Sequence, residues 1–192
     1  MEQGNIAVYP GTFDPLTNGH LSIIRRGCEI FDTVVVAVAH ETYKKSLFTH
    51  AERLDMIREV FDGVSKVVVE GFTGLLVDYV EQRGAKVILR GLRAVADFEY
   101  EFQLALMNRK LKRDVQPLFL MTDYRWLYVS STIVKAAGSL GGNIRSMVPD
   151  VICHRLYERW GIPCPPESSE ELVEPDDLYE LQSMSANGES HD

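Results

Sequence analysis

Short apolar runs alternate along this chain with segments in which apolar residues recur at helical spacing. The runs are rich in branched side chains and lie at residues 6–8, 33–40, 66–70, 87–89 and 118–121. Continuous apolar runs of this length predict strands that are buried on both faces of a parallel sheet.

Helical patterns separate these predicted strands. The first helix is expected to begin near Asn18, with an apolar face made by Leu21, Ile24, Cys28 and Phe31. A capping box of Thr49 and Glu52 predicts the second helix, and two more are expected at residues 75–82 and 98–111. This alternation favours an α/β fold, a single doubly wound, Rossmann-like domain with a five-stranded parallel sheet and right-handed crossovers.

The C-terminal part of the chain follows a different pattern. Hydroxyl residues at 130–132 cap a predicted helix that Gly138 ends, and a further C-terminal helix is expected at residues 149–160. A proline-rich stretch then ends the domain, which we place at residues 1–164. The tail at 165–192 is acidic, lacks Lys and Arg, and has few large apolar residues. We therefore expect a disordered tail that is dispensable for chemistry.

The net charge of −8 belongs to that tail. Residues 1–164 contain all 20 Lys and Arg residues and 19 of the 28 Asp and Glu residues, so the domain is nearly neutral. Without an evident basic face, we expect no nucleic-acid partner. No apolar run approaches the roughly 20 residues of a membrane span, and we expect no membrane association. Three cysteines without metal-ligand spacing suggest reduced thiols and a cytoplasmic location.

The stretch from Tyr9 to His20 joins the first predicted strand to the first predicted helix. Gly11 and Gly19 let the backbone approach a ligand closely, because no side chain intervenes. With Asn18 as the expected N-cap, the helix start offers N–H groups and a positive dipole end that suit a phosphate. His20 lies in this first turn, where it can donate to a phosphate oxygen. The plainer alternative is a loop rich in glycine and proline with a surface histidine.

Other unusual residues follow the remaining predicted strands, at the edge where ligands of open parallel sheets bind. They are Lys44 and Lys45, then Gly71, Phe72, Leu75 and Leu76, then Arg90 and Arg93, and finally the segment from Trp126 to Thr132. Singly, each suits a solvated loop, a surface cation or a helix cap. Together they predict a polyanionic ligand with an uncharged arm beside it.

Two strings of residues carry a resemblance to a known family. The residues at 9–15, with the Thr-x-Gly-His pattern of Thr17 and His20, resemble the signature of the nucleotidyltransferase superfamily. Thr17, where many relatives have histidine, and the string at 90–101 narrow the resemblance to the bacterial phosphopantetheine adenylyltransferase family. It extends from Ile6 to about Trp160 and leaves the acidic tail without a counterpart.

This resemblance implies adenylyl transfer from ATP to 4′-phosphopantetheine, which yields dephospho-coenzyme A and pyrophosphate in coenzyme A biosynthesis. It also implies Mg²⁺ and a homohexamer. The residues it assigns to ATP are Thr12, Phe13, His20, Gly91, Leu92, Arg93, Glu101, Trp126, Leu127, Tyr128, Val129, Ser130, Ser131 and Thr132. Those assigned to phosphopantetheine are Thr12, Lys44, Leu76 and Arg90. Of these, His20 is the expected transition-state stabiliser, and no protein ligand to the metal is expected.

Two other functions compete with this one. Another nucleotidyltransferase would accept nicotinate mononucleotide or a phospho-alcohol such as glycerol 3-phosphate, against which Thr17 and the string at 90–101 argue. A catalytically silent nucleotide-binding protein would have no need of Thr12, His20 and the basic residues at the strand ends. The attacking phosphate is already an anion, so the expected reaction requires neither a general base nor a covalent intermediate.

Overall fold

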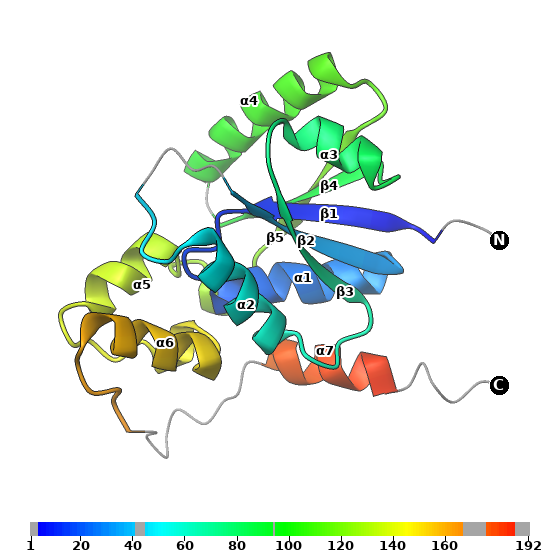
Figure 1. Ribbon diagram of the computed structural model, residues 1–192. Coiled ribbons are helices and arrows are strands. Elements are labelled where there is room, and N and C mark those ends of the chain that lie inside the picture. The colour runs from blue at the N-terminus through cyan, green and yellow to red at the C-terminus, as the bar shows by residue number, and fades with distance from the viewer. Residues whose placement is uncertain (1–3, 41–44, 94, 167–175, 187–192) are drawn as a thin grey trace.

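Five parallel strands form one sheet in the order β3-β2-β1-β4-β5 (Figure 1). They are β1 (Ile6–Gly11), β2 (Thr33–Ala39), β3 (Val67–Phe72), β4 (Val87–Leu92) and β5 (Gln116–Met121). The computed structural model describes residues 4–40, 45–93, 95–166 and 176–186. The chain winds outward from β1 to β3 and then returns to β4 on the other side of β1. The predicted doubly wound sheet is confirmed, and its topological switch point lies between β1 and β4.

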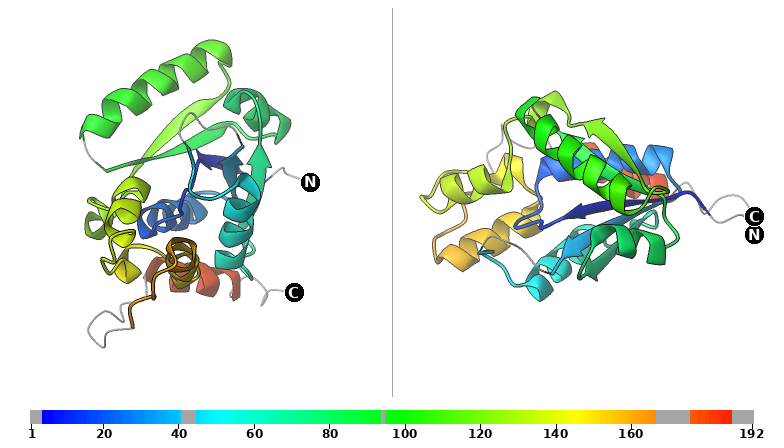
Figure 2. Two further views of the ribbon diagram at one scale, coloured as in Figure 1. Left: turned by 60° about the vertical axis from the view of Figure 1, so that its left-hand side comes forward. Right: turned by 90° about the horizontal axis from the view of Figure 1, so that it is seen from above.

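Helices cover both faces of this sheet. They are α1 (Asn18–Ile30), α2 (His50–Val60), α3 (Leu76–Gln82), α4 (Val95–Leu111), α5 (Ser131–Gly138), α6 (Asp150–Trp160) and α7 (Asp176–Ala186), with short 3₁₀ turns η1 (Tyr124–Trp126) and η2 (Arg145–Met147). The views agree that α3 and α4 lie on one side of the sheet, and that α1 and α2 lie on the other (Figures 1 and 2). No helix among the described residues combines the length and apolar character that a bilayer span requires.

The alternation of side chains along the central strands builds two cores. Val34, Val36 and Val38 of β2 pack into the larger cluster beside α1 and α2. Val35 and Ala37 of the same strand point to the smaller cluster beside α3. Every one of these side chains is fully buried, which explains why the run reads as continuously apolar.

The observed element ends differ from the predicted ones at two points that matter for the site. The N-cap of α1 is Thr17 rather than Asn18, which instead donates from its amide to the Ser146 carbonyl at 2.9 Å. Strand β4 runs on to Leu92, so Arg90 is part of the strand and does not follow it. Pairing of Arg90 with Phe119 of β5 extends the strand.

The expectation of a disordered tail does not hold for α7. This helix, within residues 165–192, packs against α1, and its Leu181 is 1% exposed within the main core. Residues 167–175 and 187–192 lie outside the described residues. Leu178 and Leu181 had left open the docking of a short turn, but the acidic composition favoured a solvated tail; with Met184 they form the apolar face of α7.

Candidate active site

The Thr17–His20 turn is fixed by reciprocal contacts at the start of α1. The backbone N–H of Thr17 donates to Nδ1 of His20 at 3.0 Å, and the Thr17 hydroxyl lies 2.9 Å from the same nitrogen. His20 therefore takes the place that Glu or Gln occupies in an ordinary capping box. The Thr-x-Gly-His spacing thus has a structural cause, because it puts the histidine at the third helical position.

These contacts decide where the proton of His20 resides. A backbone amide can only donate, so Nδ1 accepts, and the neutral ring must carry its proton on Nε2. Burial, with the positive charge of Arg93, lowers the pKa of His20 to about 4. The ring is thus neutral at pH 7, and Nε2–H is the donor it presents to the pocket.

The turn before α1 has a strained backbone that packing holds in place. Phe13 has φ of 49°, a left-handed conformation that residues with a Cβ seldom adopt. Its buried ring packs edge-on against His20 at a centroid distance of 5.2 Å, and against Tyr9 at 5.6 Å. A Cβ on Gly11 would lie 2.7 Å from the Phe13 ring, so only glycine fits there. The Phe13 ring consequently sets the position of His20.

Asp14 fastens the same turn to two distant parts of the chain. Its buried carboxylate accepts from the N–H groups of Leu47, at 2.9 Å, and Phe48, at 3.0 Å. Lys135 of α5 pairs with it at 2.5 Å. A buried carboxylate needs such donors, and here they make it a fixed anchor.

Two arginines from the β4 edge enter the site already paired with carboxylates of α4. Arg90 Nε lies 3.2 Å from Glu101 Oε2, and Arg93 Nε lies 3.1 Å from Asp97 Oδ2. Arg93 also donates to the carbonyl of Val129 at 3.2 Å, which joins the β4 edge to the segment before α5. The cationic edge expected from the sequence is therefore partly neutralised by its own carboxylates.

The N-terminus of α5 closes the site from the side opposite β4. The Ser130 hydroxyl accepts from the N–H of Ile133 at 3.1 Å, which confirms the predicted cap. The Ser131 hydroxyl donates to the Pro15 carbonyl at 2.7 Å and so ties α5 to the turn before α1. Both hydroxyls thus have structural bonds, and the phosphate donors at this end are chiefly backbone N–H groups.

A pocket of about 330 Å³ opens between these elements, at the switch point of the sheet. Of the residues expected to bind ATP or phosphopantetheine, it is lined by Phe13, His20, Arg90, Gly91, Arg93, Glu101, Val129, Ser130, Ser131 and Thr132. It is also lined by Gly11 and Gly19, where the sequence predicted a close approach of the backbone to a ligand, and by Tyr9, Pro10, Thr17 and Thr122, which were not assigned to a ligand. All of these except Thr122 belong to the stretch from Tyr9 to His20, so the motif itself could have indicated them as pocket residues. Nothing in the sequence around Thr122 indicated its place in the pocket.

The remaining expected residues lie outside this pocket. Thr12 is exposed next to it, between Gly11 and Phe13. Leu92 pairs with Met121 at the end of β4, while Leu76 packs against the smaller core. Lys44 lies outside the described residues. The last three expected residues lie in the segment before α5 and differ in exposure: Leu127 and Tyr128 are exposed, whereas Trp126 is buried.

Comparison with known proteins fits this geometry. The cytidylyltransferase-like family model matches residues 8–137. The phosphopantetheine adenylyltransferase of Oleidesulfovibrio alaskensis is 67% identical over 162 residues, which cover 84% of this chain and 95% of that protein. The chain belongs to the phosphopantetheine adenylyltransferase family.

Further members of the family agree with this assignment. The phosphopantetheine adenylyltransferase of Nitratidesulfovibrio vulgaris is 66% identical, covering 85% of this chain and 88% of that protein. That of Syntrophus aciditrophicus is 54% identical over 81% of this chain and 94% of that protein. The residues matched by the family model contain the capping turn, both arginines and most of α5, so the pocket lies within the family's shared part.

Proposed function

We propose that this chain transfers the adenylyl group of ATP to 4′-phosphopantetheine, and that dephospho-coenzyme A and pyrophosphate are the products. The observation that carries the proposal is the pocket in which His20, Arg90, Arg93 and the start of α5 face one another. The 67% identity to the phosphopantetheine adenylyltransferase of Oleidesulfovibrio alaskensis supports the choice of substrates.

In the reaction, a phosphate oxygen of phosphopantetheine attacks the α-phosphorus of ATP, and the bond to the pyrophosphate oxygen breaks. No proton has to leave the nucleophile, so the protein needs to position the two anions and stabilise the charge between them. His20 Nε2–H donates to a nonbridging oxygen of the α-phosphate, and the N–H groups at the start of α5 hold the leaving pyrophosphate. Arg90 binds the attacking phosphate, and Arg93 neutralises the phosphates of ATP.

Glu101 supports the binding of a nucleoside beside these phosphates. Its Oε2 is buried, and among the described residues it has an ion-pair partner in Arg90 but no aligned hydrogen-bond donor. A hydroxyl or amino group of the nucleoside would supply that donor.

Mg²⁺ is proposed as the cofactor, carried into the site on ATP. Within the part of the chain that the structure describes, no three metal-ligating side chains gather into a cluster. Mg²⁺ commonly keeps several waters and binds substrate phosphates, which suits this pocket. When bound, it would neutralise phosphate charge during the transfer.

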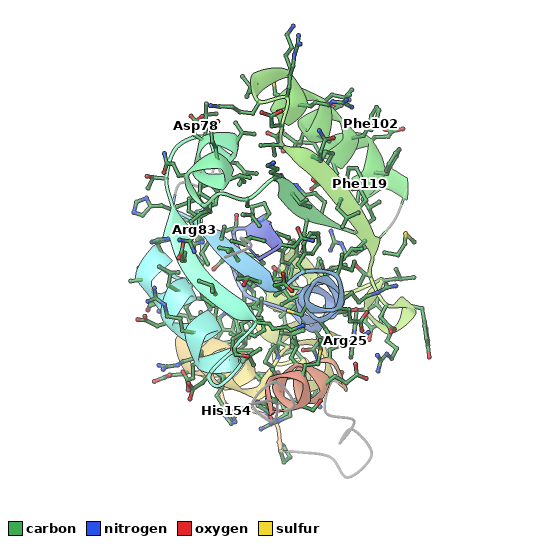
Figure 3. All side chains as sticks on the ribbon, turned by 90° about the vertical axis from the view of Figure 1, so that its right-hand side faces the viewer. Arg25, Asp78, Arg83, Phe102, Phe119 and His154 are labelled. Atoms are coloured by element: carbon green, nitrogen blue, oxygen red, sulfur yellow. The ribbon has the colours of Figure 1, made fainter. Side chains whose placement is uncertain are left out.

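We propose a homohexamer as the assembly, supported by exposed apolar side chains on α4. Those of Phe98, Tyr100, Phe102, Leu106, Met107 and Leu111 are each between 43% and 64% exposed. Figure 3 shows Phe102 on α4, above Phe119 of β5. Leu106→Asp should convert hexamers to smaller species in sedimentation velocity, and an unaltered hexamer would argue against this interface.

The cytoplasm is the proposed location, supported by the free thiols of all three cysteines.

Pyrophosphate release from ATP tests the proposed reaction when a panel of acceptors is compared. We expect release with 4′-phosphopantetheine and little with nicotinate mononucleotide or glycerol 3-phosphate. Preference for one of the latter two would establish a different nucleotidyltransferase. Absence of release with every acceptor, although ATP binds, would favour a silent nucleotide-binding protein.

A further inference from the structure

Helix α7 lies along α1 on the side that faces away from the sheet. Figure 1 shows it below α1, and Figure 3 looks along α1 with Arg25 labelled beside α7. Leu181 is buried against the main core, and Leu178 and Met184 pack next to it. These contacts make α7 an integral layer of the domain, in a part of the chain that the family resemblance does not cover.

The first turn of α7 carries a buried carboxylate with two partners. Asp177 is 1% exposed; its Oδ1 accepts from Arg25 Nε at 2.7 Å, and its Oδ2 accepts from Trp126 Nε1 at 3.2 Å. Arg25 belongs to α1 and Trp126 to η1. One carboxylate of the tail therefore bridges two elements that are separate in the sequence.

Both elements lie beside residues that line the pocket, α1 through Gly19 and His20 and η1 through Val129. Trp126 lies against the first turn of α1: a Cβ placed on Gly19 would be 3.6 Å from the Trp126 Cβ, which is van der Waals contact. On the other side, the Trp126 carbonyl accepts from the N–H of Val129 at 3.0 Å, where the pocket lining begins. A shift of Trp126 would move this lining relative to His20.

We propose that Asp177 is a positioning residue for ATP, and the proposal rests on the function argued above. By holding Arg25 and Trp126 together, Asp177 sets the distance between the start of α1 and the Val129–Thr132 segment. It touches no substrate itself. Trp126 takes part in ATP binding through this support and not through contact with the pocket.

Asp177→Asn is the direct test, because it keeps the shape of the side chain and loses its charge. The amide can accept from Arg25 or from Trp126, but its NH₂ then faces the other donor. We expect the KM for ATP to rise on the order of tenfold, since small displacements of binding groups have effects of that size or larger. The KM for 4′-phosphopantetheine should stay within about twofold, because its expected contact, Arg90, lies on the β4 side.

Glu180→Gln is the matched control on the same helix. Glu180 pairs with Arg25 at 2.8 Å but is half exposed, and no bond links it to Trp126. It should leave both KM values unchanged. If Asp177→Asn lowers the melting temperature but leaves the KM for ATP equal to that of Glu180→Gln, Asp177 is merely structural and the proposal fails.

Trp126→Phe keeps the proposal testable if Asp177→Asn does not fold. It retains a six-membered aromatic ring but loses the indole N–H together with the five-membered ring, so it should raise the KM for ATP at least as much. Where both variants fold, the KM for ATP of the double variant should be no higher than that of the single variant with the higher KM. Multiplication of the two single increases in KM would overturn the proposal.

Calorimetric titration with a non-hydrolysable ATP analogue separates this proposal from the proposed function. If the unmodified chain releases no pyrophosphate with 4′-phosphopantetheine, the proposed function fails, while the titration still compares Asp177→Asn with Glu180→Gln. Equal affinity in those two variants would refute the role of Asp177 alone.

Discussion

The Tyr9–His20 turn, which runs into α1, and helix α7, which packs along α1, contribute differently to the site. The turn presents atoms to the pocket, through the Nε2–H of His20 and the residues around it. Helix α7 supports the pocket from behind, through the contact of Asp177 with Trp126. Chemistry should therefore depend on the turn, whereas the affinity for ATP and the stability of the fold should depend on α7.

His20→Ala should have the largest effect, because it removes the donor that the turn presents to the pocket. Loss of a donor that acts mainly in the transition state typically costs about 10²–10³ in kcat. We expect such a loss in steady-state assays, with the KM for ATP changed only a few-fold. His20→Asn and His20→Gln can still donate and should recover part of the rate. A folded, equally stable His20→Ala enzyme with near-normal kcat would contradict the assignment of His20 to the chemistry.

Arg90→Ala should separate the two substrates within the pocket. A hydrogen bond to a charged group contributes about 1.5–3 kcal/mol, so binding of 4′-phosphopantetheine should weaken by about tenfold to a hundredfold. ATP binding should suffer much less, although Glu101 loses its ion-pair partner. Calorimetry with each substrate measures both effects, and a larger loss for ATP would show that the two subsites are exchanged.

Truncation after Pro166 removes α7 and tests how far the stability of the fold and the affinity for ATP depend on it. The sequence led us to expect no effect, but the packing of α7 reverses that expectation. Burial of one large aliphatic side chain such as Leu181 contributes about 1.5–3 kcal/mol, so the free energy of unfolding should fall by at least that amount. The KM for ATP should also rise, while kcat stays within a few-fold.

A shorter truncation, after Ala186, is the control because it keeps the whole of α7. Urea denaturation of the two truncated chains measures the difference. Equal stability of the chain cut after Pro166 and the full chain would show that α7 contributes nothing to the fold.

The smallest expected effect is a dependence of stability on pH. Burial lowers the pKa of His20 to about 4, below its ordinary value near 6.5, so the unfolded chain binds more protons between these values. The free energy of unfolding should therefore fall as the pH drops from about 6.5 toward 4 and should be independent of His20 above that range. Denaturation of His20→Gln should show a shallower slope, and identical slopes would contradict a neutral ring with a lowered pKa.

How much the sequence revealed depended on whether a feature was local. The number and places of the five strands, though not all their ends, the capping box at Thr49 and the cap at Ser130 were predicted correctly, because each rests on neighbouring residues. Most of the expected ATP residues meet in one pocket, because strand ends in a parallel sheet share one edge.

Features that depend on tertiary contacts could not be read in this way. Asp177 looks like one of many acidic residues until Arg25 and Trp126 are placed around it. The role of Asp14 likewise appears only when Leu47, Phe48 and Lys135 converge on it in space. Even the N-cap of α1 was misassigned by one residue, because Thr17 and Asn18 are both good capping residues and the contact with Ser146 decides between them.

The protonation state of His20 is the most direct test of its role as a neutral donor to the α-phosphate. Nitrogen NMR of labelled histidine, recorded between pH 5 and pH 8, distinguishes a protonated from an unprotonated ring nitrogen. With Nδ1 accepting from Thr17, we expect Nε2 to carry the proton throughout this range, without titration and with ATP bound or absent. Protonation of Nδ1, or titration of the ring near pH 6.5, would show that His20 is not the fixed, neutral donor on which the proposed transfer depends.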